Sequence, residues 1–143
     1  MLGKGGCQAP SIGSRQQDGS AGIMVVRWLA GSAMKFSQAM QSVTRHGDQW
    51  QASVSADWLQ GRSAFGGLQA ALALRAVREL VPPDMPLRTL QVTFLSPVPA
   101  GSVAIRAARL RHGRSAIQVE ASLCDGEQVL CRLLGVFGSA RAS

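Results

Sequence analysis

Residues 65–81 read FGGLQAALALRAVRELV, and this stretch decides the fold. Two glycines open it, and from position 68 onward only four residues are polar: Gln69, Arg75, Arg78 and Glu79. The pattern predicts a helix over 68–81 whose N-terminal half is apolar on nearly every side. A helix of that kind is normally enclosed by other elements and does not lie on a surface. Pro82 and Pro83 follow directly and end the helix, because proline cannot continue it.

After this helix the sequence changes to short β-rich segments separated by turns. Alternating apolar and polar residues predict four strands, over 88–95, 102–111, 115–123 and 128–137. In the second of them the apolar register shifts after Ala107, which predicts a β-bulge. The last strand is apolar on both faces, which is typical of a strand inside a sheet or at a subunit interface.

The residues before the helix add one more strand. Trp50, Ala52 and Val54 alternate with polar residues and predict a strand with one buried face. Residues 36–43 fit a short amphipathic helix, 46–48 a turn, and 57–64 a loop. With only one long helix, a doubly wound fold is excluded. The expected class is α+β: an antiparallel sheet of about five strands wrapped around one long buried helix, which is the hotdog architecture.

The charge and the composition limit the kinds of partner that the chain can bind. The 143 residues carry 15 Lys and Arg against 8 Asp and Glu, for a net charge of +7. A basic balance suits an anionic partner such as nucleic acid, an acidic membrane surface or a phosphate-bearing cofactor. The chain has no tyrosine and only four phenylalanines, so it offers few platforms for base stacking and nucleic-acid binding is disfavoured. No apolar run is long enough to predict a transmembrane helix.

The cysteines and histidines do not form a recognisable site. Cys7, Cys124 and Cys131 contain no CxxC pair, and we expect the last two to be small buried hydrophobes in a reducing cytoplasm. His46 and His112 lie far apart in sequence and are expected at the surface. Neither a metal nor another cofactor is predicted.

Residues 1–33 differ from the rest, since they are rich in glycine and lack a sustained apolar period. They do not resemble a signal peptide, because more than twenty mixed residues precede a short, interrupted apolar run. They are interpreted as a disordered extension or as the result of a start codon assigned too early, with Met34 as a natural start. Residues 34–143 are then expected to form a single hotdog domain.

A chain that starts at Met34 is expected to unfold at the same thermal midpoint as the full-length chain. A Gly-rich, aperiodic segment buries too little apolar area to offset the entropy lost on ordering it. Thermal unfolding of both chains, followed by circular dichroism, measures this. A midpoint lower by more than a few degrees in the shorter chain would contradict the prediction.

Four motifs and one arginine carry a resemblance to a known family: Phe65-Gly66-Gly67, Phe94-Leu95-Ser96-Pro97, the segment 110–115 (LRHGRS), Val136-Phe137-Gly138, and Arg62. In order and spacing they resemble the acyl-CoA thioesterase II-like family of the hotdog superfamily, over about residues 36–140. The resemblance implies a hotdog fold, an acyl-CoA substrate, and hydrolysis to a free acid and CoA.

The chain resembles only the N-terminal repeat of that family, whose members usually carry two hotdog repeats in tandem. In the best-known members the catalytic Asp, Thr or Ser, and Gln lie in the second repeat, so no position here inherits those roles. The residue after the double glycine is often Gln in the family. Here that position is Leu68, and Gln69 comes one step later.

The catalytic candidates are Gly67, Gly66 and Asp57. The two glycines allow close backbone approach at a helix N-terminus and so offer oxyanion-hole donors, although they would equally permit tight packing of helix on sheet. Asp57 is a candidate general base or, alternatively, a turn or cap residue. Ser63 is expected to be the helix N-cap and not a nucleophile, because no base lies near it in sequence.

The expected substrate-binding residues are Phe65, Arg62, Gln69, Arg111 and Arg114. Arginines of the 111–114 turn, with Arg62 and Arg109, would bind the phosphates of CoA, or else form a solvated basic hairpin. Three functions stay open: an acyl-CoA thioesterase acting as a homodimer or higher homo-oligomer, a non-catalytic acyl-CoA-binding hotdog or inactive half of a tandem-repeat enzyme, and, less favoured, a basic nucleic-acid-binding domain.

Overall fold

The computed structural model describes residues 33–140, all within the compact unit Ser32–Ser143. The expectations for the N-terminal segment lie outside the described residues, apart from Ala33. The elements, in chain order, are α1 (Phe36–Gln41), β1 (Thr44–His46), β2 (Gln49–Val54), the short 3-10 helix η1 (Ala56–Trp58), β3 (Leu59–Gln60), β4 (Ser63–Ala64), α2 (Gly66–Arg78), β5 (Leu87–Phe94), β6 (Gly101–His112), β7 (Ala116–Asp125) and β8 (Gln128–Gly138).

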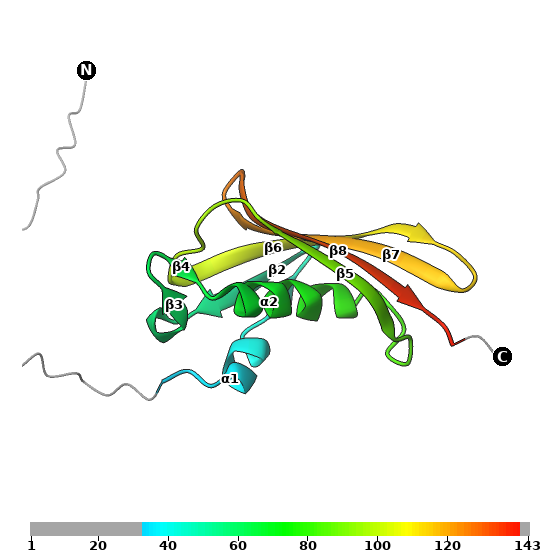
Figure 1. The fold of residues 1–143 in the computed structure, drawn as a ribbon, viewed down its shortest axis with the longest axis horizontal. Coiled ribbons are helices and arrows are strands. Elements are labelled where there is room, and N and C mark those ends of the chain that lie inside the picture. Colours follow the sequence, from blue (N-terminus) through cyan, green and yellow to red (C-terminus); the bar gives the residue numbers. More distant parts are fainter. Residues whose placement is uncertain (1–32, 141–143) are drawn as a thin grey trace, which may run out of the picture. The chain divides into compact units, whose positions relative to one another are not determined.

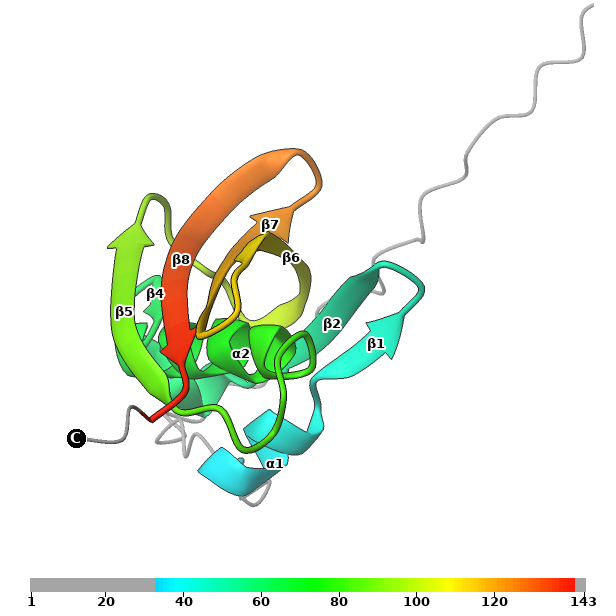
Figure 2. The same ribbon diagram turned by 90° about the vertical axis from the view of Figure 1, so that its right-hand side faces the viewer.

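Six of the strands form one antiparallel sheet in the order β1-β2-β6-β7-β8-β5. The sheet curls around α2, and α1 lies on the same side as α2 (Figures 1 and 2). This is the α+β hotdog arrangement, so the predicted fold class is confirmed. The main sheet has one strand more than expected, because β1 was not predicted and its last residue, His46, was assigned to a turn. All three side chains of β1 are exposed, so it carries no apolar alternation that would reveal a strand. The predicted loop 57–64 also contains the two short strands β3 and β4, which pair with each other.

The side of the sheet that faces α2 forms the core. One row of paired residues crosses five strands on that side: Trp50, Ile105, Leu123, Cys131 and Phe94. The first four are buried, whereas Phe94 on the edge strand β5 is 55% exposed. Burial therefore decreases at the edge strand β5, which keeps apolar side chains in contact with solvent.

Helix α2 is buried along one side only. Leu68, Leu72 and Val77 have almost no exposed surface, whereas Gly67 and Arg75 are exposed. The prediction that the helix is enclosed on all sides is therefore wrong, because the sheet and α1 cover only part of its circumference. Nowhere between residues 33 and 140 is there a helix that is long and apolar enough to cross a membrane.

Two side chains fasten the C-terminal end of α2. Arg78 donates hydrogen bonds to the carbonyl oxygens of Met85, at 2.6 Å, and of Pro83, and its guanidinium lies 5.1 Å from the centre of the Phe137 ring. Glu79 accepts from Trp50 Nε1 at 2.8 Å and from Arg75 Nη1 at 2.9 Å. These bonds hold the loop after α2 and the start of β2 against the helix.

Two finer predictions for the strands are confirmed. A bulge occurs in the second strand after the helix, as expected, but the register between β6 and β7 shifts between Arg109 and Arg111 and not directly after Ala107. Strand β8 pairs with β7 on one side and β5 on the other, so it lies inside the sheet as its apolar pattern predicts.

Candidate functional site

The start of α2 presents two backbone N–H groups without an acceptor. Phe65 is the N-cap residue, and its carbonyl oxygen accepts from Leu68 N at 3.0 Å and Gln69 N at 3.2 Å. Within the part of the chain that the structure describes, the N–H groups of Gly66 and Gly67 donate to no protein oxygen. The first N–H groups of a helix lack intrahelical partners and carry partial positive charge, so this is where an anion or a developing oxyanion is stabilised.

No side chain caps the helix, and the prediction of Ser63 as the N-cap is therefore wrong. Ser63 Oγ instead accepts from Val98 N at 3.0 Å and from Gln69 Nε2 at 3.2 Å. Because the hydroxyl is used to join three segments, the two glycine N–H groups stay available to a ligand.

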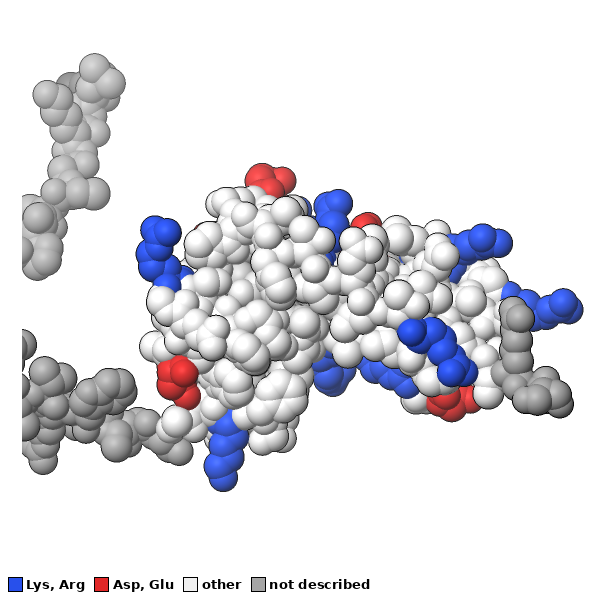
Figure 3. All heavy atoms as spheres, viewed as in Figure 1, with Lys and Arg blue, Asp and Glu red and all other residues white. Residues whose placement is uncertain are grey.

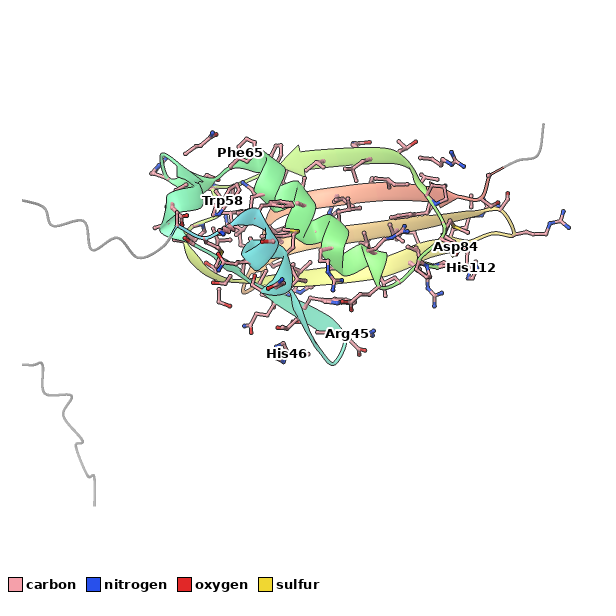
Figure 4. The ribbon with its side chains drawn as sticks, turned by 90° about the horizontal axis from the view of Figure 1, so that it is seen from below. Arg45, His46, Trp58, Phe65, Asp84 and His112 are labelled. Carbon is pink, nitrogen blue, oxygen red and sulfur yellow. The ribbon has the colours of Figure 1, made fainter. Side chains whose placement is uncertain are left out.

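Two aromatic rings lie against the glycines. A Cβ atom on Gly66 would come within 2.9 Å of Phe94 Cζ, and one on Gly67 would overlap the ring of Phe65. Any larger residue at either position requires the ring that it meets to move. Phe65 is 44% exposed and, with the half-exposed ring of Phe94, forms an apolar wall beside the N–H pair; Figure 4 shows Phe65 at the start of α2. The contact with Phe94 joins residues 28 positions apart, and sequence reasoning noticed Phe94 only as part of a motif.

Gln69 is 3% exposed, and its side chain makes hydrogen bonds that stabilise the start of α2. Its Nε2 donates to the carbonyl oxygen of Ala64 at 2.6 Å in addition to the Ser63 hydroxyl. Among residues 33–140, its buried Oε1 finds no hydrogen-bond partner. Gln69 thus connects the strand before the helix to the helix itself.

Asp57 lies in η1, in the segment before α2. Its Oδ2 accepts a hydrogen bond from Met34 N at 2.7 Å, and the neighbouring Trp58 Nε1 donates to Met34 O at 2.7 Å. The carbonyl oxygen of Trp58 accepts from Phe65 N at 2.9 Å, which places this segment next to the helix start. One oxygen of the candidate base is therefore engaged in holding the chain before α1.

The predicted phosphate-binding arginines do not come together. Arg62 lies between β3 and β4, next to the start of α2, whereas Arg111 and Arg114 lie at the β6–β7 hairpin. This hairpin is at the end of the domain where α2 finishes, as the positions of Phe65 and His112 in Figure 4 make clear. With 13 residues, α2 is about 20 Å long, so the two groups are separated by at least that order of distance.

The buried thiols are poor nucleophiles. Burial raises the pKa of Cys131 to about 11, and burial also raises the pKa of Cys124, although Arg106 and Arg132 act in the opposite direction. Both cysteines are unpaired and buried, as predicted. His46 and His112 are exposed, also as predicted. Residues 33–140 contain no cluster of three or more His, Cys, Asp or Glu that would hold a metal ion.

Cys131 is expected to resist alkylation by iodoacetamide in the native chain at pH 8 and to react fully in urea. The reason is that its raised pKa leaves almost no thiolate at that pH, and its side chain has no exposed surface. Peptide mass spectrometry after timed labelling measures the modification at each cysteine. Rapid native labelling at Cys131 would show that the core around β8 opens readily.

An antiparallel sheet curled around one long helix (Figure 2) defines the hotdog class of domains. The chain belongs to the family of the acyl-CoA thioesterase N-terminal domain, whose family model matches residues 54–138. That match includes the helix, the glycines and the strands β5 to β8. No curated protein sequence matches the chain.

Solved structures share the fold. A hot dog fold protein of unknown function from Alicyclobacillus acidocaldarius has 26% identity and a TM-score of 0.67, over 76% of this chain and 40% of that one. The tesB protein of Mycobacterium avium subsp. paratuberculosis has 15% identity and a TM-score of 0.66, over 76% of this chain and 43% of that one. This chain therefore spans about two fifths of their length.

A shorter structure is covered almost completely. The Escherichia coli PaaI protein, from the phenylacetic acid degradation operon, has 17% identity and a TM-score of 0.61. The match covers 73% of this chain and 87% of that one. Hotdog domains similar to this one thus occur in solved structures of both lengths.

Proposed function

We propose that the chain binds acyl-CoA thioesters at the start of α2 and hydrolyses them there. The observation that carries the proposal is the pair of unengaged N–H groups of Gly66 and Gly67. A thioester carbonyl oxygen gains negative charge when water attacks, and two aligned donors at a helix N-terminus stabilise that charge. Membership in the acyl-CoA thioesterase family supports the same chemistry.

An apolar path leads away from these donors. Phe65 and Phe94 flank them, and Ala70, Ala71 and Leu74 form a partly exposed stripe farther along α2. We place the acyl chain along this path, because it would remove exposed apolar surface from water on both partners. Arg62, next to the helix start, is the proposed contact for a polar part of CoA, and Gln69 shapes the floor of the site.

Hydrolysis also requires an activated water, and Asp57 is the proposed general base. Its Oδ1 accepts no hydrogen bond from any group within residues 33–140, although Oδ2 is bound to Met34 N. The carboxylate would take a proton from the attacking water while the tetrahedral oxyanion is held by the two N–H groups. Collapse of the intermediate then breaks the C–S bond, the proton held by Asp57 passes to the leaving sulfur, and CoA leaves as the thiol.

The second candidate is a non-catalytic acyl-CoA-binding domain or one half of a tandem-repeat enzyme. Two observations favour it: Asp57 is partly occupied by the chain before α1, and this chain spans about two fifths of the length of two of the solved structures above. For either candidate we propose a cytoplasmic location, which suits the unpaired, buried thiols of Cys124 and Cys131.

A panel of acyl-CoA esters of increasing chain length separates the two functions. Release of CoA thiol, followed with a thiol-reactive chromogen, reports hydrolysis, and calorimetric titration of the same esters reports binding. Turnover supports the thioesterase, and binding without turnover supports the binding domain. A chain that neither binds nor hydrolyses any of the esters would refute both.

The chain is expected to form a homodimer through β5 and the exposed residues beside it. Among the described strands, β5 pairs with β8 alone, and Leu90, Phe94 and Leu95 on and after it are exposed. An open strand edge flanked by apolar side chains is a surface that proteins normally cover. Sedimentation equilibrium at micromolar concentration should give twice the chain mass.

A matched pair of variants locates this interface. Leu95→Glu should dissociate the dimer, whereas Leu110→Glu, which changes an equally exposed leucine on β6, should leave it intact. A wild-type chain that sediments as a monomer would contradict both the dimer and a site completed by a second copy.

A further inference from the structure

Three arginines meet at the end of the sheet that lies farthest from the glycines. Arg88 is at the start of β5, and Arg111 and Arg114 lie at the β6–β7 hairpin; we call these three residues the arginine end. They line two adjoining hollows. One, of about 380 Å³, contains Arg88 and Ser139, the other, of about 280 Å³, contains Arg111 and Arg114, and both are lined by Ser115 and Ala116.

The hollows lie on the side of the sheet that faces away from α2. Ala116 pairs with Gly138 and Gln118 with Val136, and these four residues line the hollows. The residues between them, Ile117 and Phe137, are paired with one another and buried in the core. Because successive side chains in a strand point to opposite faces, the sheet separates the arginine end from the glycine N–H groups of the same chain.

Positive charge at this end is not neutralised by the described part of the protein. No Asp or Glu lines either hollow. Among residues 33–140, the ion pairs involve Arg75 and Arg106, and none involves Arg88, Arg111 or Arg114. Asp84 is at the same end, on the loop after α2, and does not line the hollows. Figure 3 shows basic side chains spread around this right-hand end of the domain.

Hydrogen-bond donors that are held in fixed positions lie beside these arginines. Arg88 Nε donates to Gly138 O at 3.0 Å, which holds the guanidinium at the end of β8 and leaves its Nη groups for a ligand. Gly113 N donates to Ala116 O at 2.8 Å and closes the hairpin. In the described chain, the N–H groups of Arg114 and Ser115 have no acceptor. Arginine guanidinium groups and unengaged backbone N–H groups in turns are typical ligands of phosphate oxygens in proteins.

We propose that the arginine end is a binding site for a phosphate-bearing small molecule, with a diphosphate group seated across Ser115 between the two hollows. A nucleic-acid strand fits less well, because the exposed aromatic residues among 33–140 are Phe36, Phe65 and Phe94, on α1, beside the start of α2 and at the end of β5. The phosphates have two possible sources, a CoA whose thioester is held by another copy of the chain, or a ligand independent of the thioester site. The site itself does not depend on the proposed hydrolysis.

Calorimetric titration of the full-length chain with inorganic pyrophosphate, at physiological ionic strength, tests the site. Arg111→Gln and Arg114→Gln should each weaken binding about tenfold, since each removes charge-assisted hydrogen bonds. Arg132→Gln is the matched control, because it removes the same charge from an exposed arginine on β8 outside both hollows. All three replaced side chains are exposed, so the thermal midpoint should stay the same.

Three results would overturn the proposal: no pyrophosphate binding, an equal loss in Arg132→Gln, or tighter binding of single-stranded RNA that the same arginine variants abolish. Titration with CoA in the Gly67→Val background identifies the source. Loss of CoA affinity both there and in Arg111→Gln supports a CoA shared between copies of the chain. CoA binding that Arg111→Gln weakens and Gly67→Val leaves unchanged supports a ligand independent of the thioester site. If pyrophosphate binding fails while thioester turnover persists, the proposed function stands without this site.

Discussion

Gly67→Val is expected to lower acyl-CoA hydrolysis by about 10²–10³-fold, the usual effect of losing one oxyanion-hole donor. A side chain at this position overlaps the ring of Phe65, which must move, and the added methyl groups cover the N–H pair. Gly67→Ala adds only the Cβ atom and should lose less activity, because the exposed ring of Phe65 is free to turn aside. Initial rates of CoA release under saturating ester measure the series.

Arg75→Val is the matched control for the helix itself. It adds a β-branched residue at an exposed position about two turns farther along α2, outside the proposed acyl path, which costs helix propensity without touching the N–H pair. It should retain activity within a few-fold, and circular dichroism should show all three variants folded. Full activity in a folded Gly67→Val chain would show that the start of α2 takes no part in the reaction.

Leu72→Ala is expected to lower the free energy of unfolding by about 2–5 kcal/mol, the usual range for removing a buried leucine. Leu72 has no exposed surface and lies on the side of α2 that packs against the sheet. Urea unfolding followed by circular dichroism gives the midpoint and slope from which the loss is calculated.

Leu110→Ala provides the comparison for Leu72, because Leu110 is 53% exposed and has already half its surface in water. It should cost less than about 1 kcal/mol, as surface substitutions usually do. A loss below about 1 kcal/mol at Leu72 as well would mean that the helix does not anchor the core.

The catalytic candidates show which parts of the site can be predicted from local sequence. Gly66 and Gly67 could be singled out because two glycines before an apolar run mark a helix start, and free N–H groups follow from helix geometry alone. The ring of Phe94 over Gly66 could not be predicted, since it depends on β5 lying beside α2. The hydrogen bond from Met34 N to Asp57 likewise depends on the tertiary structure, because it joins the residues before α1 to the segment before α2.

The arginines that were predicted to bind phosphate could not be grouped correctly from local sequence. Arg62 and the 111–114 turn were grouped because both are basic, and sequence contains no measure of the distance between them. Strand order places the β6–β7 hairpin at the far end of the domain, where Arg88 joins Arg111 and Arg114. A residue absent from the sequence-based site thus becomes part of the arginine end.

By itself, the sequence determined the elements whose signal is local: the helix, the strands with apolar alternation, the bulge in β6 and the hotdog class. Periods of two and 3.6 residues are properties of a single segment, so they can be recognised before any contact is known. The short strand β1 has no buried side and stayed hidden. Only the tertiary structure decided which side of α2 is covered, which rings flank the glycines and where the arginines gather. Those features follow from the order and pairing of strands far apart in the chain, because long-range pairing brings together side chains that no local period relates.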